Sequence, residues 1–158
     1  MLLRVFALVL MVVPGVALAQ QVAFGGIRAN TSAPVEITAD SLSVRQEDGT
    51  AIFSGNVLIL QEDMRLQAAS VQVEYGDDHG QIKRLHASGG VTLVSAADSA
   101  EAREAVYEPA SGQIVMTGDV LLTQGANVMA GQKLVVDLKT GTGQMDGRVR
   151  TILQPGGN

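Results

Sequence analysis

The stretch SGQIVMTGDV, residues 111–120, decides the fold because it has two relatives elsewhere in the chain. The same Gly-Gln-apolar start occurs at Gly80 (GQI) and at Gly143 (GQM), 32 and 31 residues away from Gly112. A self-similar spacing of this length is typical of one supersecondary unit stacked on copies of itself. The sequence therefore predicts a stack of similar units.

Inside each unit the apolar residues recur with a period of two. In the quoted stretch Ile114, Met116 and Val120 share one face. The same alternation is found over residues 34–38, 41–45, 51–60, 64–68, 71–75, 85–93, 128–130, 134–138 and 149–153. This period indicates strands with one buried and one wet face. Turn residues such as Asp48-Gly49 separate the runs. We expect an all-β fold of repeated short antiparallel strands.

A glycine lies in the middle of several runs and is followed two residues later by valine, at Gly55, Gly89, Gly118 and Gly147. Glycine inside a strand marks a bulge or a sharp bend. A bend at the same place in every unit lets successive strands curl around a common axis and enclose one apolar face. The alternative that stays open is a closed β-sandwich whose core is simply full.

One segment has a conflicting local signal. Residues 95–108, SAADSAEAREAVYE, are rich in alanine and glutamate, which favour a helix. The segment nevertheless occupies the place that strands fill in the other units, so we expect strand-turn-strand there.

The N-terminus has the layout of a secretory signal. Residues 1–19 contain Arg4, an apolar run, a Pro14-Gly15 break and small residues at Ala17 and Ala19, which predicts cleavage after Ala19 and export. An uncleaved membrane anchor is the alternative, although the apolar run is shorter than the ~20 residues of a spanning helix. Residues 20–33 are expected to form a flexible arm, 34–155 the folded domain and 156–158 a short tail.

Composition excludes several classes of function. The chain has no cysteine, so it does not depend on disulfides. Sixteen acidic residues outnumber eleven basic ones and aromatic residues make up 3%, which argues against a nucleic-acid partner. His79 and His86 stand alone, whereas a metal site needs three or four converging ligands. No catalytic motif is found, so we expect no catalytic residues, metal or cofactor.

At these same residues the chain resembles the LptA family of periplasmic lipopolysaccharide-transport proteins, which carry an OstA-like domain. The resemblance rests on PVEITADSLSVRQEDGTAIFSGNVLILQEDMRLQAASVQVEY from Pro34, AVYEPASGQIVMTGDVLLTQGANVMAGQKLVVDL from Ala105, and RVRTILQP from Arg148. It extends from Pro34 to Pro155.

The resemblance implies a β-jellyroll with two sheets in a twisted V that is open at both ends. The protein would then be a non-enzymatic periplasmic carrier that holds the lipid A acyl chains of lipopolysaccharide in an apolar interior. Its copies would join head to tail by strand pairing and link membrane-anchored inner-membrane and barrel-forming outer-membrane partners. Interior lipid contacts carried over by position are Thr31, Val35, Ile37, Leu93 and Tyr107. The final alternating run suggests Val149, Thr151 and Leu153 as the assembly edge.

Three other functions stay open at this point. The chain could be the membrane-anchored partner of the same family if residues 1–19 are retained. It could be a structural β-repeat protein with a filled core and no ligand, or a hydrolase built on a β-solenoid.

Overall fold

The computed structural model describes residues 22–23, 27–77 and 80–155. The predicted signal peptide, His79 and the tail 156–158 lie outside these residues. Eleven strands and no helix occur in the described part. The strands are β1 (Val22–Ala23), β2 (Glu36–Thr38), β3 (Ser41–Arg45), β4 (Thr50–Gln61), β5 (Met64–Tyr75), β6 (Ile82–Ser95), β7 (Asp98–Glu108), β8 (Gln113–Gln124), β9 (Asn127–Asp137), β10 (Thr142–Asp146) and β11 (Arg150–Ile152).

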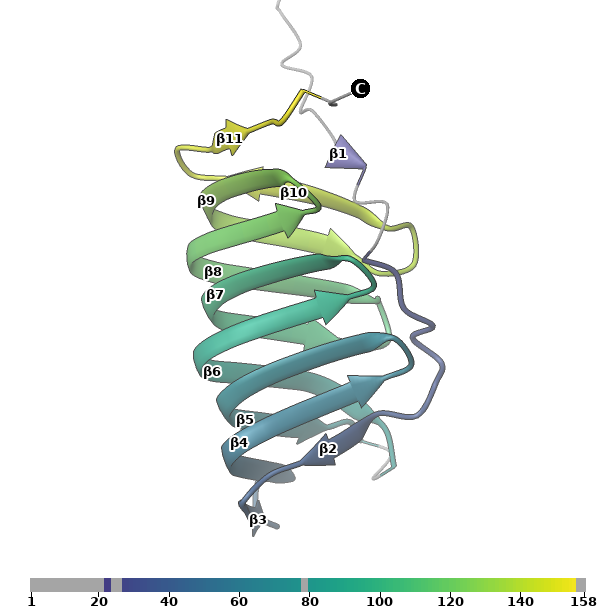
Figure 1. Ribbon diagram of the computed structural model, residues 1–158. Helices are drawn as coiled ribbons and strands as arrows, with labels where there is room; N and C mark the ends of the chain where they lie inside the picture. Colours follow the sequence, from purple (N-terminus) through teal and green to yellow (C-terminus); the bar gives the residue numbers. More distant parts are fainter. Residues whose placement is uncertain (1–21, 24–26, 78–79, 156–158) are drawn as a thin grey trace, which may run out of the picture.

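All eleven strands belong to one antiparallel sheet, which confirms the predicted all-β antiparallel fold (Figure 1). Its order is β1-β10-β9-β8-β7-β6-β5-β4-β2, with β3 also paired to β4 and β11 also paired to β9. From β3 to β10, neighbours in the sheet are neighbours in sequence, so this part of the chain runs as a meander, whereas β1, β2 and β11 pair with β10, β4 and β9. The two sheets that the resemblance implies are the two halves of this one sheet.

The halves arise because the strands bend in the middle. In β8 the bend is at Gly118 and Asp119, whose φ angles are +86° and +46°, and the register with both neighbouring strands shifts there. A Cβ on Gly118 would lie 2.9 Å from the Cβ of Arg103, so both φ and space favour glycine. The same left-handed pair recurs at 55–56, 89–90 and 147–148.

This bend joins runs that look separate in the sequence. Residues 64–68 and 71–75 form the single strand β5, and the six strands β4 to β9 are each 11 to 14 residues long. The strands β4 to β9 pass through both halves. Half A extends across the sheet from β2 at one edge to β11 at the other. Half B begins at β3 and ends at β10. The expected short strands are therefore halves of long, bent strands.

The alanine-rich segment 95–108 contains the end of β6 at Ser95, a turn at 96–97 and the strand β7, which confirms strand-turn-strand over helix. Ala100 and Ala105 point inward and are 0% and 1% exposed. Pairing with β6 and β8 along its length satisfies the backbone, so tertiary context overrides the local helix propensity.

Residues 27–35, called the strap, run along the open side of the V between β1 and β2 (Figure 1). Ile27 is 0% exposed, and alternate residues from there onward are more buried than those between them. Ile27 belongs to the same core cluster as the strands, and Ala29 and Val35 pack against it. The strap thus closes the mouth between the two halves.

Candidate functional site: the apolar interior and the open edges

The interior is built from rows of inward side chains that cross the strands. The inner row of half A contains Ile37, Ile59, Leu66, Leu93, Ala100, Leu122, Met129 and Thr151. The inner row of half B contains Val44, Ala51, Val73, Leu85, Tyr107, Ile114, Val136 and Gly143. Each row passes from one end of the sheet to the other. The apolar face is therefore continuous along the stack.

Four of the residues singled out from the sequence fall on these rows. Ile37 stands at one end of the half A row, Leu93 in its middle and Thr151 at its far end. Tyr107 lies in the half B row. Leu93 and Tyr107 are 0% and 1% exposed, Ile37 is half-buried and Thr151 is exposed.

Tyr107 links the two halves across the interior. Its hydroxyl donates a 2.6 Å hydrogen bond to Oε1 of Gln61, which is 1% exposed at the mouth end of β4. Nε2 of Gln61 in turn donates to the carbonyl of Ala33 in the strap at 2.8 Å. Burial raises the pKa of Tyr107 to about 12, and the bond to Gln61 opposes this only in part. The phenol therefore stays neutral and the hydrogen-bond chain stays intact at ordinary pH.

Further bonds hold the strap on both sides of the mouth. The Ser95 hydroxyl of half A donates to the Arg28 carbonyl at 3.3 Å. On the half B side, the Ala29 amide donates to the Leu138 carbonyl at 3.3 Å, and the Arg28 guanidinium donates to the Thr140 carbonyl at 3.1 Å. The strap is thus tied across the mouth by backbone and side-chain bonds together.

The remaining two interior candidates, Thr31 and Val35, lie on the strap beside a pocket. Its volume is about 630 Å³. It is lined by Thr31, Ser32, Ala33, Val35, Gly80, Gln81, Ile82, Pro109, Ala110 and Lys139. The pocket opens between the strap and the turns of half B, so all five interior candidates lie on the inner rows or at the mouth that leads to them.

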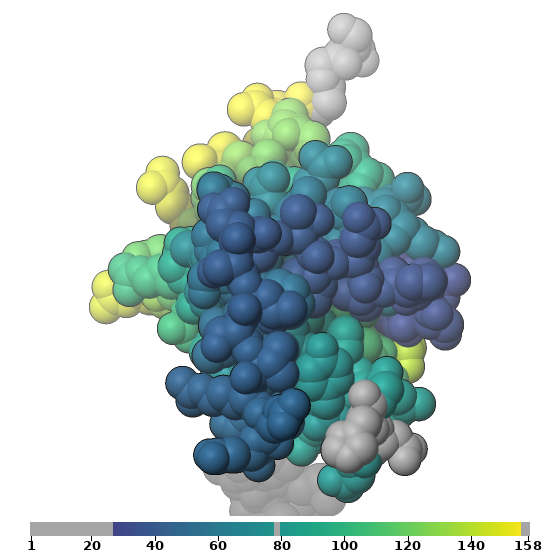
Figure 2. All heavy atoms as spheres, turned by 90° about the horizontal axis from the view of Figure 1, so that it is seen from below, coloured from purple at the N-terminus to yellow at the C-terminus, as the bar shows by residue number. Residues whose placement is uncertain are grey.

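The two ends of the sheet expose apolar side chains. At one end Leu42 and Val44 of β3 are 56% and 62% exposed, and at the other Val149 and Leu153 are 47% and 67% exposed. In the sheet of the described chain, β2 and β3 each pair only with β4, and β11 pairs only with β9. Their outer sides therefore carry unpaired N–H and C=O groups that can accept another strand. Figure 2 looks onto this end, where the dark blue residues of β2 and β3 face the viewer.

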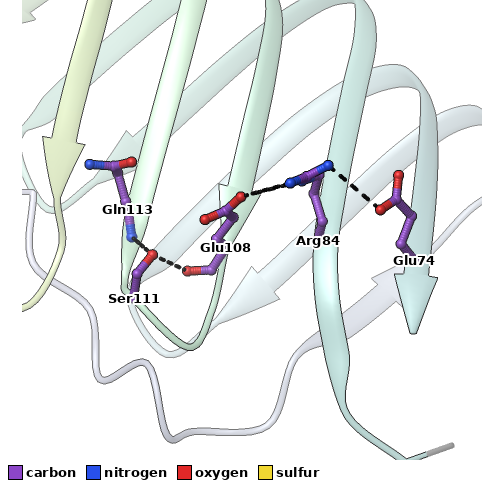
Figure 3. Close-up of polar contacts among 5 residues, drawn as sticks. All are labelled: Glu74, Arg84, Glu108, Ser111 and Gln113. Atoms are coloured by element: carbon purple, nitrogen blue, oxygen red, sulfur yellow. Dashed lines mark hydrogen bonds and ion pairs between the residues drawn. The ribbon is translucent and has the colours of Figure 1, made fainter. Parts of the chain in front are cut away.

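The outer face is polar and self-paired. Arg84 of β6 lies between Glu74 of β5 and Glu108 of β7, at 3.7 and 3.1 Å (Figure 3). The Ser111 hydroxyl contacts the Glu108 carbonyl at 3.2 Å and accepts from the Gln113 amide at 3.4 Å (Figure 3). These partly exposed ion pairs contribute little to stability, but they pair the charges of Glu74, Arg84 and Glu108.

No group of three or more potential metal-ligating side chains occurs among the described residues. In the same part of the chain, every buried side-chain nitrogen or oxygen has a hydrogen-bond partner, and no helix could cross a membrane. His86 pairs with Glu104 at 3.4 Å on the outer face.

Residues 36–142 match the family model described as LptA/(LptD N-terminal domain) LPS transport protein. The chain belongs to this family. A Rhizobium meliloti (strain 1021) protein described as uncharacterized is 33% identical over 141 residues, which cover 82% of this chain and 76% of that protein.

A solved structure shows that the family fold is shared. The crystal structure is that of LptH from Pseudomonas aeruginosa, described as the LptA homologous periplasmic component of the conserved lipopolysaccharide transport device. It aligns with a TM-score of 0.72 at 16% identity, over 80% of this chain and 99% of that one. At this identity the likeness establishes the fold of this LptA-family chain.

The residues that sequence reasoning missed are polar ones at the mouth. Gln61 and Ser95 follow Ile59 and Leu93 by two positions and therefore lie on the inner face. The signal that could have revealed them is a polar residue at a position where the strand's alternation expects an apolar one, next to the turn.

Proposed function

We propose that this chain is a periplasmic, non-enzymatic carrier of lipopolysaccharide that holds lipid A acyl chains against its inner rows. The observation that carries the proposal is the continuous half A row from Ile37 at one open end to Thr151 at the other. Acyl chains require an apolar surface and few hydrogen bonds, and this row offers such a surface along the whole stack. Membership of a lipopolysaccharide-transport family supports the same conclusion.

Acyl chains reach these rows through the mouth in this proposal. The inner side chains are packed against each other and the strap, so the strap and the two halves must separate to admit a lipid. The pocket beside Thr31 and Val35 is the entry point. Phosphate-bearing headgroups stay outside, near Lys139 at the pocket rim.

The chain further acts as a bridge by head-to-tail strand pairing. Its two open ends carry exposed apolar residues and unpaired strand edges, and two different edges that pair propagate as a filament. The terminal copies would pair with a membrane-anchored inner-membrane protein and with an outer-membrane barrel protein. The family description includes the N-terminal domain of LptD, so the same fold serves in another member of the family.

A photocrosslinking amino acid at Ile37 or at Glu36 tests lipid binding. Ile37 is half-buried on the inner face and Glu36 is exposed on the outer face of the same strand. Capture of lipopolysaccharide at position 37 but not at position 36 is expected. Equal capture at both positions would overturn the interior assignment.

The second candidate is a filled-core scaffold without a ligand, and the packing of the core favours it. Side chains such as Leu66, Leu122 and Ile114 are 0–2% exposed without any ligand. Mass spectrometry of protein purified from membranes separates the two functions. Bound lipopolysaccharide supports the carrier, and lipid-free protein supports the scaffold.

A further inference from the structure

The bends of neighbouring strands are connected by side chains on the outside of the V. At the bend of β8, the Asp119 carboxylate pairs with Arg103 of β7 on one side. On the other side it accepts from the Gln132 amide of β9 at 3.3 Å. At the first bend the Asn56 amide donates to the Asp40 carboxylate at 2.9 Å. At these two bends the second residue of the left-handed pair is thus bonded to a side chain beside it, whereas the pair in β6 is Gly89-Gly90 and has no such side chain.

The bend residues at the two edges of the sheet carry opposite charges. At one edge stands Arg148, the second residue of the last left-handed pair, with φ of +47°. Its side chain is exposed and has no hydrogen bond or ion pair with any described residue. At the other edge stands Asp40, whose Oδ2 bonds to Asn56 while its outward side faces solvent. One edge therefore carries an exposed acid that bonds only to Asn56 of its own copy, and the other edge carries an exposed base.

Strand direction permits a second copy to continue the sheet by simple translation. Half A contains eight strand positions, β2, β4, β5, β6, β7, β8, β9 and β11, and all adjacent pairs are antiparallel. Because eight is even, β2 of a next copy in the same orientation meets β11 antiparallel. No inversion of the copy is needed.

The inner row fixes the register of this contact. If Thr151 is placed opposite Ile37 of the next copy, the apolar row continues without a break. Counting back past the start of β11 and forward past the end of β2 then places Arg148 opposite Asp40, two residues outside the two strands. The register that continues the inner row therefore also brings the two charged bend residues together on the outer face.

We propose that the guanidinium of Arg148 pairs with the Asp40 carboxylate of the next copy and fixes the register of a joint between β11 and β2. The pair repeats between copies the Arg103–Asp119 contact found within one copy. It also discourages one closed dimer, because pairing β11 with β11 in the register that puts Val149 opposite Val149 brings Arg148 opposite Arg150 of the second copy. This inference rests on the proposed bridge and names the contact that directs it.

The joint is placed at β11 rather than β10 because part of the β10 edge is already occupied. Val22 and Ala23 of β1 pair with Gly143 and Thr142. In the continued register these two positions would face Val44 and Arg45 of the next copy. The β11 edge carries no such cover in the described chain.

Charge reversal tests the pair, with the association of the purified chains measured by analytical ultracentrifugation. Arg148→Glu and Asp40→Lys should each raise the dissociation constant of self-association about five- to tenfold, because like charges then face each other. An equimolar mixture of the two variants should restore association toward the wild-type level, since each joint between unlike variants contains one acid and one base. Lys83→Glu is the matched control, because it makes the same charge change on β6, inside the sheet.

The outcomes separate this inference from the function on which it rests. Wild-type protein that stays monomeric would overturn the bridge and the joint together. Wild-type protein that associates, with variants and mixture indistinguishable from it, would overturn the joint alone. Asp40→Asn, which keeps the side-chain size and the oxygen that accepts from Asn56, controls for folding and should weaken association less than Asp40→Lys.

Discussion

Gly89 and Gly90 are adjacent in β6 and have nearly the same φ, +81° and +87°. Their surroundings differ. A Cβ on Gly89 would lie 2.6 Å from the Cβ of Ala69, whereas a Cβ on Gly90 would have nothing within 4 Å. Both positions therefore favour glycine for their left-handed backbone, and Gly89 also for the close approach of a neighbouring strand.

We expect Gly90→Ala to destabilise the fold by about 1 kcal/mol, the usual cost of a left-handed residue with a Cβ. Gly89→Ala should cost roughly 1–3 kcal/mol more, because the added methyl overpacks against Ala69. Urea unfolding measures both. Ala69→Gly should rescue Gly89→Ala but not Gly90→Ala, and equal rescue of the two would contradict the steric explanation.

Tyr107 predicts an alkaline limit to stability. Its pKa of about 12 in the folded chain exceeds the ordinary tyrosine value of 10.0. Between pH 10 and 12 the folded state thus retains a proton on Tyr107 that the unfolded state loses. The contribution of the neutral phenol to the free energy of unfolding is therefore complete below pH 10. It should fall between pH 10 and 12, by roughly 2–3 kcal/mol in total.

Tyr107→Phe should remove this alkaline decrease and lower stability near neutral pH by about 1–2 kcal/mol, since Oε1 of buried Gln61 loses its donor. Denaturant unfolding at a series of pH values provides the measurement. Tyr75→Phe, at a tyrosine that is 39% exposed, is the control and should leave the decrease in place. A decrease that persists in Tyr107→Phe would assign it to another group.

At the scale of the elements, hydrophobic period and mid-run glycines predict the strands and their bends, because both features depend on local sequence. They do not predict that 64–68 and 71–75 are one strand, since the intervening Ala69-Ser70 has little hydrophobic contrast. The hydrophobic alternation does not predict the strap either. Its inward residues include Ala29, Thr31 and Ala33, whose small side chains give almost no hydrophobic signal.

In the candidate site, too, the features set by local sequence could be predicted and the long-range contacts could not. The strand parity of Ile37 and Leu93 is a local property, so the sequence is enough to place them on the inner face. The contact between Tyr107 and Gln61 joins residues 46 positions apart. Such contacts follow from the arrangement of whole halves, which a repeat pattern does not specify.

A disulfide between strap and sheet tests whether the strap controls entry of lipid. A Cβ on Gly112 would lie 3.1 Å from Cγ2 of Thr31, a separation that suits Thr31→Cys with Gly112→Cys. Because the chain has no other cysteine, a single bond forms. With the bond closed, lipid capture by a crosslinker at Ile37 should fall to the level of Glu36.

The reduced form of the same variant is the control, because it carries the same strain at Gly112, where φ is +71°. Reduction should restore capture. Capture that is the same in oxidised and reduced protein would show that lipid reaches the interior without displacing the strap.

At the scale of the whole molecule, the β11 edge would give the proposed bridge its direction. Deleting residues 148–158 removes β11 and exposes β9 in half A. Since β9 is antiparallel to β11, it would meet β2 of a next copy in parallel, and the register that joins Thr151 to Ile37 is lost. We expect a folded monomer that still takes up lipid.

Light scattering over a concentration series compares the deleted and complete chains. The complete chain should grow into larger oligomers as concentration rises, and the deleted chain should not. A closed dimer of fixed size, present in both, would contradict head-to-tail pairing.

The single continuous sheet also determines how such a bridge would respond to mechanical force. Hydrogen bonds of an antiparallel sheet lie perpendicular to the strands, so in a stack of copies they lie along the direction of pull. Each copy adds eight strand spacings, roughly 38 Å. Tension would open the ladders one after another, beginning with the shortest. The joint is short because β2 and β11 have three residues each. Inside one copy, β2 and β3 together pair with β4 at eight positions, and β10 and β11 together pair with β9 at eight. Membranes moving apart would therefore separate the copies before any copy unfolds, and the released edges could rejoin.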